Sequence, residues 1–284
     1  MDFLIDSQMP TLIFGIVTYK ERYWECSSFC TLLESFKQSG LDEMLNVFIV
    51  DNTDTEGWKL DEKYFGKNIS IEYMNLKNLG IAVAYNVINE HACLNSYKWI
   101  VFLDQDTILP ASTFSVYNKK AKENNDLLPL KAPIIYSNNI ILSPCIYKNY
   151  RSYPVSKFSK TVFDCEDYSC INSGLMIQSL FFKKVGGYNT GLFVDFCDHD
   201  FIERAKKYLD NIELLDLELE QNFSSDTHNK QQSIKRYQIF CQDIKQFYKN
   251  RSKFKIFVFV DLSHLLKLTY VFKSTKFFKI RFLE

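Results

Sequence analysis

Two aspartates stand one residue apart at the end of an apolar segment, in the stretch WIVFLDQD at residues 99–106. Two carboxylates at the end of a buried strand repel each other and lose hydration, so a positive partner is expected nearby. Mg²⁺ or Mn²⁺ would suit Asp104 and Asp106, because these hard ions take carboxylate oxygens and are completed by substrate phosphates. The simpler alternative is that acidic residues after a strand cap a helix or shape a turn.

A second acidic group lies in the stretch GLFVDFCDHDFIER, just before an expected helix, and contains Asp195, Asp198 and Asp200. The three cannot all cap that helix, although Asp198 or Asp200 can. A carboxylate that faces a substrate across a metal ion can take the proton from an acceptor hydroxyl. The sequence has no GxxxxGK[ST] loop, and its four histidines show no HExxH spacing. We therefore expect the two acidic groups to carry the chemistry.

The segments around the first acidic pair alternate between strands and helices. Apolar strands are predicted at residues 11–19, 47–52, 69–75 and 99–104, with helices over 24–39 and from Gly80 onward. This alternation favours a doubly wound, parallel α/β sheet, in which ligands bind outside the carboxyl ends of the strands. Tyr19, Asp51 and Asn78 fall at those ends together with the acidic pair, so we expect them to meet at one rim of the sheet.

The pattern loosens after Pro110. A polar helix is predicted over 112–125, strands and loops over 128–170, an apolar strand over 170–178, and a short helix that stops at Gly186 and Gly187. The apolar strand is interrupted by Asn172, Ser173 and Gly174.

Composition restricts the class of protein. The chain has 284 residues, of which 46% are hydrophobic, enough for one large α/β domain with an appendage or for two small domains. Its eight cysteines form no CxxC pair, which favours reduced packing cysteines over a zinc site or a disulfide framework. The amino terminus does not have the pattern of a secretory signal, so we expect a cytoplasmic protein.

Charge is distributed unevenly along the chain. From residue 245 onward there are ten basic and two acidic residues, a net charge of +8, which leaves −8 for residues 1–244. The same basic tail is rich in Phe and Leu, but its apolar runs are too short to span a bilayer. Two interpretations stay open: an amphipathic segment on an anionic membrane surface, or a helical subdomain that packs its Phe stripe on the core or on another subunit. Nucleic acid is disfavoured because the rest of the chain is acidic.

Six short motifs occur in the order seen in bacterial family 2 glycosyltransferases. They are VTYK (17–20), VDN (50–52), NLGIAVAYN (78–86), FLDQD (102–106), INSGLMI (171–177) and GGYNTGLFVDFCDHDFIER (186–204). The DQD form, together with NLGIA, resembles the rhamnosyltransferase branch that builds surface polysaccharide. The resemblance implies a GT-A fold, a Rossmann-like and mostly parallel sheet flanked by helices. It also implies an inverting transfer of a sugar from its nucleotide diphosphate to an acceptor hydroxyl.

The resemblance also implies roles for residues of the donor pocket. The residues expected to line the base and ribose pocket or to approach the nucleotide are Thr18, Tyr19, Asp51, Asn78 and Gly80. The residues expected under the donor sugar are Asn172, Ser173 and Gly174.

Roles for the acidic residues follow in the same way. Asp106 matches the direct ligand of Mn²⁺ or Mg²⁺, and Asp104 lies near the ribose and the metal. Asp198 matches the general base, Asp200 an acidic neighbour that contacts the sugar or the acceptor, and Asp195 is a rival for the base.

One position departs from the family pattern. Relatives often carry a histidine after the second acidic group, in a stretch like LELEQNF, where it completes the metal site. Here Gln221 occupies that position, and the nearest histidine is His228. Either His228 serves as the metal ligand through a shifted loop, or the third protein ligand is missing and the metal is held mainly by Asp106 and the diphosphate.

These features predict a catalytic domain at residues 1–225 and a basic, amphipathic helical extension at 226–284. We expect a metal-dependent glycosyltransferase that moves rhamnose from dTDP-rhamnose to a hydroxyl of a surface-polysaccharide or lipid-linked glycan. A UDP-hexose or UDP-N-acetylhexosamine donor is the alternative within this class, and a non-catalytic, membrane-docked subunit that binds nucleotide or glycan is the alternative outside it. Besides donor and acceptor, the expected partners are the inner face of the cell membrane and, in a homo-oligomer, a second copy of the chain.

Overall fold

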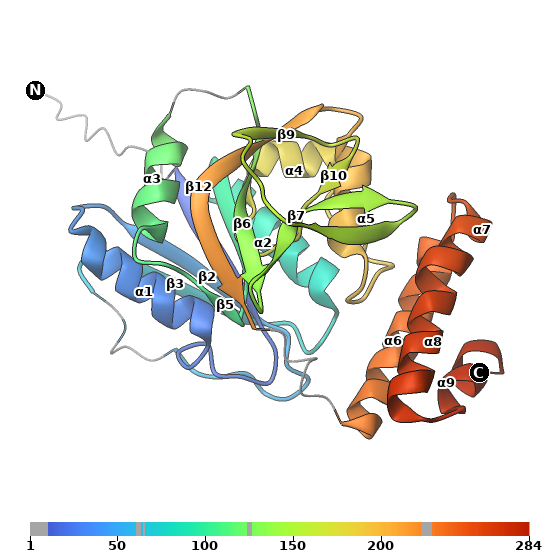
Figure 1. The fold of residues 1–284 in the computed structure, drawn as a ribbon. Helices are drawn as coiled ribbons and strands as arrows, with labels where there is room; N and C mark the ends of the chain where they lie inside the picture. The colour runs from blue at the N-terminus through green and yellow to red at the C-terminus, as the bar shows by residue number, and fades with distance from the viewer. Residues whose placement is uncertain (1–10, 61–63, 65, 124–126, 223–228, 284) are drawn as a thin grey trace, which may run out of the picture.

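A computed structural model describes residues 11–60, 64, 66–123, 127–222 and 229–283. These residues form one twelve-stranded sheet with helices on both faces and a helical extension at the carboxyl terminus (Figure 1). The strands are β1 (Leu12–Thr18), β2 (Leu45–Asp51), β3 (Ile69–Asn75), β4 (Trp99–Asp104), β5 (Thr107–Ile108), β6 (Leu130–Ser137), β7 (Ile140–Lys148), β8 (Arg151–Val155), β9 (Val162–Asp164), β10 (Tyr168–Ser169), β11 (Met176–Gln178) and β12 (Asn211–Gln221).

The four strands predicted first along the chain are parallel neighbours in the order β4-β1-β2-β3. Every residue of β1 is buried, as expected for a strand with helices on both faces. In the register, Thr18 pairs with Asp51, and Val17 pairs with Asp104. The predicted α/β fold is confirmed, and the carboxyl ends of these strands meet at one rim.

The other half of the sheet is mostly antiparallel and corrects one prediction. The segment 170–178 is a strand only at Met176–Gln178, which pairs antiparallel with β4. The preceding Asn-Ser-Gly forms a turn, because Gly174 has a φ of +76°. A Cβ at this position would lie 2.5 Å from Leu219 and 2.6 Å from Pro133, so only glycine fits there. The turn brings Ser173 beside the end of β4.

Helices cover the two faces of the sheet. Those of the catalytic part are α1 (Ser27–Ser39), α2 (Ile81–Leu94), α3 (Thr113–Lys122), α4 (Ser179–Val185) and α5 (Cys197–Ala205). Alternate residues of β1 face opposite sides: Phe14 packs with the core of α1 and α3, whereas Ile13 packs with the core of α2, α4 and α5. All eight cysteines are free thiols, and six of them are buried.

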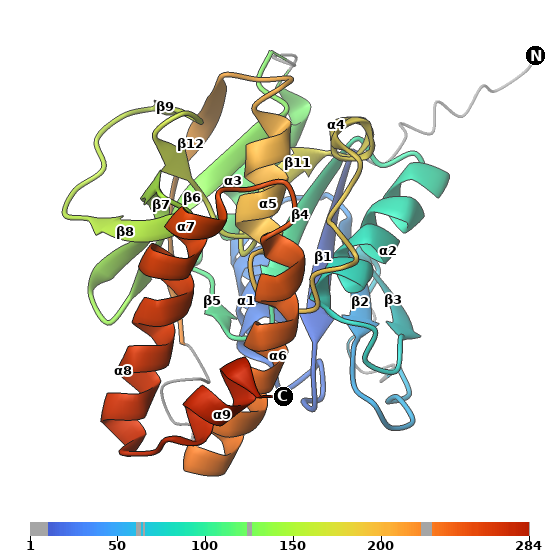
Figure 2. The same ribbon diagram turned by 90° about the vertical axis from the view of Figure 1, so that its right-hand side faces the viewer.

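The extension consists of α6 (Lys230–Phe247), α7 (Lys253–Ile256), a π-helical turn (Phe257–Asp261), α8 (Leu262–Phe272) and α9 (Lys276–Phe282). Figure 2 shows α6 and α8 side by side, with α9 across their lower ends. Phe240, Phe247 and Leu265 belong to the same hydrophobic cluster as α2 and α5, so this inner face is continuous with the core. No helix in the described part of the chain combines the length and the apolarity of a membrane span. The predicted boundary at residues 225–226 lies outside the described residues.

Candidate active site

The first acidic pair lies at the rim of the sheet. Asp104 is the last residue of β4, and Asp106 follows in the turn before β5. The side chain of Gln105, between them, accepts a hydrogen bond from the backbone N–H of Tyr19 at 2.6 Å. The turn is thereby attached to the end of β1, and both carboxylates are half-buried.

The Asp104 carboxylate has neutral partners. It accepts hydrogen bonds from the Tyr85 hydroxyl at 2.5 Å and from Gln221 Nε2 at 3.4 Å. Its backbone N–H donates to Ser173 Oγ at 3.2 Å. Burial, and then the charge of Asp106, raises the pKa of Asp104 to about 6, against the opposing effect of these hydrogen bonds. The site therefore favours the binding of positive charge beside Asp104.

Gln221 is the residue that joins the two carboxylates. It ends β12, which pairs antiparallel with β5 and places Gln221 opposite Thr107. Its Nε2 also donates to Asp106 Oδ1 at 3.0 Å. The side chain is 4% exposed, and its Oε1 is buried with no hydrogen-bond partner among the described residues. His228, the predicted alternative ligand, lies outside the described residues.

The donor atoms at this rim fit a hard divalent cation. Two carboxylates and one amide oxygen are the ligand types that Mg²⁺ and Mn²⁺ prefer. The Nε2 of Gln221 is within hydrogen-bonding distance of both carboxylates, and the Oε1 of the same amide is buried with no hydrogen-bond partner among the described residues. The part of the chain that the structure describes contains no cluster of three His, Cys, Asp or Glu side chains with metal-binding geometry. Within the described chain, Gln221 is the candidate for a third protein ligand, because its amide already reaches both carboxylates.

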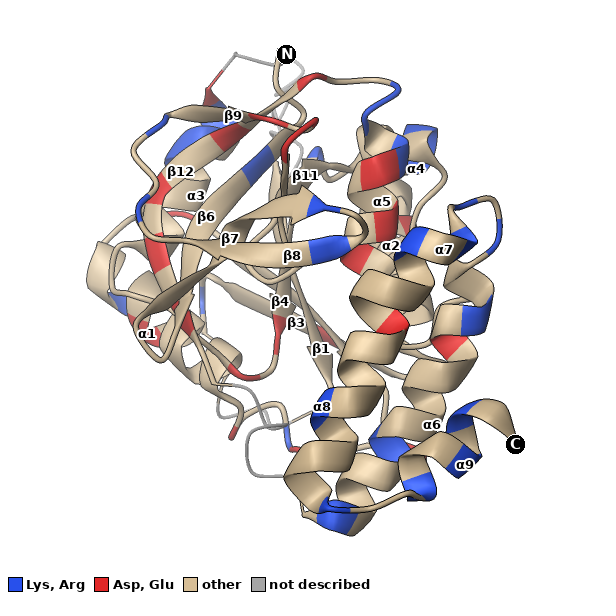
Figure 3. Ribbon diagram, turned by 45° about the vertical axis from the view of Figure 1, so that its right-hand side comes forward, with Lys and Arg blue, Asp and Glu red and all other residues tan. Residues whose placement is uncertain are grey.

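The three acidic residues around α5 have different partners. Asp195 forms a bidentate ion pair with Arg236 of α6, at 2.5 and 2.6 Å. Asp200 is 3% exposed and lies between Arg204, at 2.9 Å, and Arg251, at 2.6 Å. Figure 3 shows the acidic bands of α5 beside the basic region around α7.

Asp198 is the member of this group without a cationic partner among the residues described. Its Oδ1 accepts only the backbone N–H of His199, at 2.8 Å. Its negative charge contributes to the raised pKa of Asp104 and, after burial, to the raised pKa of Tyr188. Asp198 and Asp104, 94 residues apart in the sequence, are therefore close enough in the fold for their charges to interact.

The extension holds the loop that carries Asp198. Asp243 of α6 accepts three hydrogen bonds from the backbone N–H groups of Phe193, Val194 and Asp195, at 2.7, 2.8 and 2.7 Å. Phe196 stacks on Phe247 of α6, with ring centroids 4.4 Å apart. These contacts fix the chain just before α5, in whose first turn Asp198 lies.

A second set of contacts holds the start of α5 from the opposite side. The ring nitrogens of His199 hydrogen-bond to the hydroxyls of Ser152 and Ser169, each at 2.7 Å. The same ring stacks on Tyr147, with centroids 4.6 Å apart. His199, whose backbone N–H donates to Asp198, is thus held by contacts of its ring with Ser152, Ser169 and Tyr147.

The residues predicted for the base and ribose pocket lie at the same rim. The Thr18 hydroxyl is buried and has no hydrogen-bond partner in the described structure, whereas Tyr19 is 41% exposed. Asp51 is fully buried: its carboxylate accepts hydrogen bonds from Thr53 at 2.6 Å and from Tyr73 at 2.7 Å. The structure thus places Asp51 in an internal network that shapes the loop after β2.

The loop predicted to approach the nucleotide contains two residues with positive φ. Asn78 has a φ of +61°, and Gly80 has a φ of +95° at the start of α2. A Cβ on Gly80 would lie 2.9 Å from the carbonyl oxygen of Phe193, so the close contact of Gly80 is with the acidic loop. The N–H of Ile81 donates to that same carbonyl at 2.8 Å. Gly80 therefore connects the α2 loop to the loop that carries Asp198.

The turn predicted under the donor sugar lies next to Asp104. Ser173 is buried and hydrogen-bonds to both Asp104 and Thr107. Asn172 accepts a hydrogen bond from the Tyr188 hydroxyl at 2.5 Å. The structure therefore brings this turn together with Asp104 and with Tyr188.

Sequence reasoning missed three residues of this region. Tyr85 sits within an apolar stretch, where an aromatic residue is usually core packing, and Tyr188 follows the glycines of GGYNTG. Only their positions in the fold reveal which groups their hydroxyls contact. Glu21 follows β1, and its pKa is raised by burial and then by the nearby charge of Asp106. The sequence signal that could have identified Glu21 is its position shortly after the end of a strand, which it shares with the acidic pair.

Comparisons with known proteins identify the fold. No protein-family model matches the sequence, and no curated protein is similar to it. Residues 1–349 of S. aureus TarS in complex with UDP superpose with a TM-score of 0.51 at 13% identity, covering 94% of this chain and 72% of that one. The complex of the same TarS fragment with UDP-GlcNAc gives 0.52 at 13% identity, covering 94% and 74%.

GalNAc-T7, another glycosyltransferase, is similar in structure to this chain to the same degree as TarS. GalNAc-T7 with UDP, GalNAc and Mn²⁺ gives a TM-score of 0.52 at 13% identity, covering 98% of this chain and 57% of that one. The chain also spans 49% of a longer TarS structure. These neighbours are GT-A glycosyltransferases, and at this level of identity the likeness shows that the chain has the GT-A fold.

Proposed function

We propose that the protein is a metal-dependent inverting glycosyltransferase that uses a nucleotide-diphospho-sugar. The observation that carries the proposal is the unequal pairing of the acidic residues. Asp195 and Asp200 are held by arginines, whereas Asp198 has no cation beside it in the described chain and lies close enough to Asp104 for its charge to raise the pKa of that carboxyl. A carboxylate without a cationic partner can accept a proton, and a neighbouring acidic pair can hold the cation that a diphosphate requires.

In the proposed reaction, the acceptor hydroxyl oxygen attacks the anomeric carbon of the donor sugar. The bond from that carbon to the diphosphate oxygen breaks, its electron pair leaves with the nucleotide diphosphate, and the hydroxyl proton passes to Asp198. Asp106, Asp104 and the amide oxygen of Gln221 would hold a divalent cation, which would supply positive charge for the departing diphosphate. Tyr85 and Ser173 orient Asp104 at the end of β4.

Two donor classes are supported by different observations. The DQD and NLGIA motifs support dTDP-rhamnose, whereas the nucleotide in the TarS and GalNAc-T7 structures is UDP and supports a UDP-hexose or UDP-N-acetylhexosamine. The proposed acceptor is a hydroxyl of a surface-polysaccharide or lipid-linked glycan.

A panel of dTDP- and UDP-sugars, scored by release of the nucleotide diphosphate with Mn²⁺ or Mg²⁺, tests both parts. We expect one nucleotide class to be turned over, and Asp106→Ala and Asp198→Ala each to abolish transfer without loss of fold by circular dichroism. Full turnover by both variants would contradict the assignment. Binding of nucleotide by the native protein without turnover of any donor would instead favour a non-catalytic subunit.

A further inference from the structure

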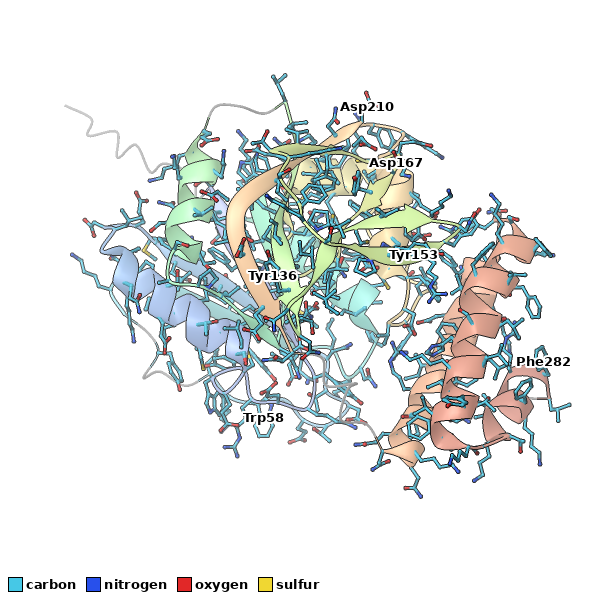
Figure 4. The ribbon with its side chains drawn as sticks, viewed as in Figure 1. Trp58, Tyr136, Tyr153, Asp167, Asp210 and Phe282 are labelled. Carbon is cyan, nitrogen blue, oxygen red and sulfur yellow. The ribbon has the colours of Figure 1, made fainter. Side chains whose placement is uncertain are left out.

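The outer side of the extension exposes apolar side chains at helical spacing. On α8, Leu266 is 50% and Tyr270 is 84% exposed, four residues apart on one face. On α9, Phe278 and Phe282 repeat the same spacing, with ring centroids 6.4 Å apart. We call this the α8–α9 surface; it comprises Leu266, Lys267, Tyr270, Val271, Lys273, Lys276, Phe278, Lys279, Phe282 and Leu283. Figure 4 shows Phe282 on the outer side of the extension, away from the sheet.

Unpaired lysines surround these apolar side chains. Two of the ten basic residues of the tail, Arg251 and Arg281, are engaged in ion pairs with acidic residues. The other eight are exposed lysines with no acidic partner in the described chain: Lys245, Lys249, Lys253, Lys255, Lys267, Lys273, Lys276 and Lys279. Four of them belong to the α8–α9 surface. The excess positive charge of the tail is therefore on its outside, among exposed aromatic rings.

The helices of the extension are held together by buried polar contacts, and their inner side packs on the core. Asp261 is 1% exposed and binds Arg281 of α9 through both carboxylate oxygens, at 2.8 and 2.9 Å from Nε. The Tyr248 hydroxyl also donates a hydrogen bond to Asp261, at 3.0 Å. Phe277 and Ile280 turn into the core while Phe278 and Phe282 turn outward. Phe278 and Phe282 are thus exposed on a helix, α9, whose opposite face is packed against the core.

The α8–α9 surface lies at the active-site end of the molecule. Figures 1 and 2 place the lower end of α8, and α9, at the same height as the loops that follow β1 and β2. Figure 4 labels Trp58, which follows β2, at that same end. The α8–α9 surface is therefore at the same end of the molecule as the rim of the sheet, and it faces away from the sheet (Figures 1, 2 and 4).

We propose that the α8–α9 surface docks on an anionic lipid bilayer. Aromatic rings that enter the headgroup boundary, surrounded by lysines that meet lipid phosphate, are the features of an interfacial membrane helix. A second copy of this chain fits less well, because the same surface on both partners would place lysines against lysines. The role of docking rests on the proposed function: docking would hold the enzyme on the membrane that carries a lipid-linked acceptor.

Co-sedimentation with vesicles tests the surface without any substrate. The full chain should bind phosphatidylcholine vesicles that contain phosphatidylglycerol, should bind pure phosphatidylcholine weakly, and should be released by salt. Each lysine near an anionic surface contributes roughly fivefold to partitioning. Reversal of two charges in Lys276→Glu/Lys279→Glu should therefore weaken binding by at least about 25-fold. Phe278→Ser/Phe282→Ser should weaken it by at least about tenfold, through lost apolar burial.

The control reverses two exposed lysines of α1 and α3, on the other side of the protein, in Lys37→Glu/Lys119→Glu. This variant should bind like the native chain, and UDP or dTDP binding in solution should be unchanged in all variants. Equal binding to neutral and anionic vesicles, or an equal loss in the control, would overturn the proposal. Absence of vesicle binding together with a native dimer that Phe278→Ser/Phe282→Ser dissociates would assign the surface to a second copy. Vesicle binding without turnover of any donor would contradict the proposed function alone.

Discussion

Replacement of Gln221 by leucine is the perturbation that best tests how the acidic pair binds a cation. The amide now donates to Asp106 at 3.0 Å and to Asp104 at 3.4 Å, while its Oε1 is buried without a partner. A cation between the carboxylates would repel the NH₂ group. A half-turn about the Cγ–Cδ bond would exchange the two amide atoms and bring Oε1 toward the cation.

The structure sets the magnitude for both possible roles. If the amide only competes with the cation, its removal frees one good charge-assisted hydrogen bond, worth about 1.5–3 kcal/mol, and Mn²⁺ should bind about 10–100-fold more tightly. If Oε1 coordinates, leucine removes a ligand, and Mn²⁺ should bind at least about tenfold more weakly. We expect the weaker binding, because coordination also satisfies an oxygen whose burial without a partner costs about 1–3 kcal/mol.

The measurement is a titration of the metal-stripped protein with Mn²⁺, followed by the electron paramagnetic resonance signal of the free ion, with and without UDP. Gln178→Leu is the matched control, because Gln178 is a half-buried glutamine with an unpartnered Nε2 in the described structure, opposite Trp99 at the far end of β4. Its affinity should be that of the native protein. Equal or tighter Mn²⁺ binding by Gln221→Leu would refute coordination by the amide oxygen.

Three further predictions concern the acidic residues. Because the folded protein holds Asp104 protonated up to about pH 6 and the unfolded chain releases that proton near 3.8, the folded state binds more protons between these values. Stability in EDTA should therefore fall as pH rises through this window, by at most about 3 kcal/mol, and Asp104→Asn should remove the slope in urea melts. Asp200→Asn should lower the free energy of unfolding by about 3 kcal/mol, because two arginines lose a buried partner, while kcat falls far less than in Asp198→Ala. Asp243→Asn should lower it by about 2–3 kcal/mol and also reduce transfer, because three N–H groups of the acidic loop lose a charged acceptor; an unchanged Tm would contradict the role of α6.

The strands and helices of the catalytic part could be predicted because their signals are local. A fully buried parallel strand is an unbroken apolar run, and its carboxyl end is where the polar residues begin, so Asp51 and Asp104 could be placed at one rim. The strand predicted over 170–178 was wrong for its first six residues. Its apolar content indicated burial, but a buried turn around Gly174 satisfies the same pattern.

The amino-acid sequence by itself determined the α/β order, the two acidic groups and the basic, aromatic tail, since each depends on residue type and short spacing. Only the tertiary structure decided which acidic residue is unpaired. Arg236 lies 41 residues beyond Asp195, and Arg251 lies 51 residues beyond Asp200, and no local pattern connects either pair. The pairing of Asp200 with Arg204, four residues further along α5, is the one local contact among them. The same holds for Gln221, which reaches Asp106 across 115 residues because β12 pairs with β5. The charge state of a buried group depends on what folding places around it, and that is a property of the packed molecule.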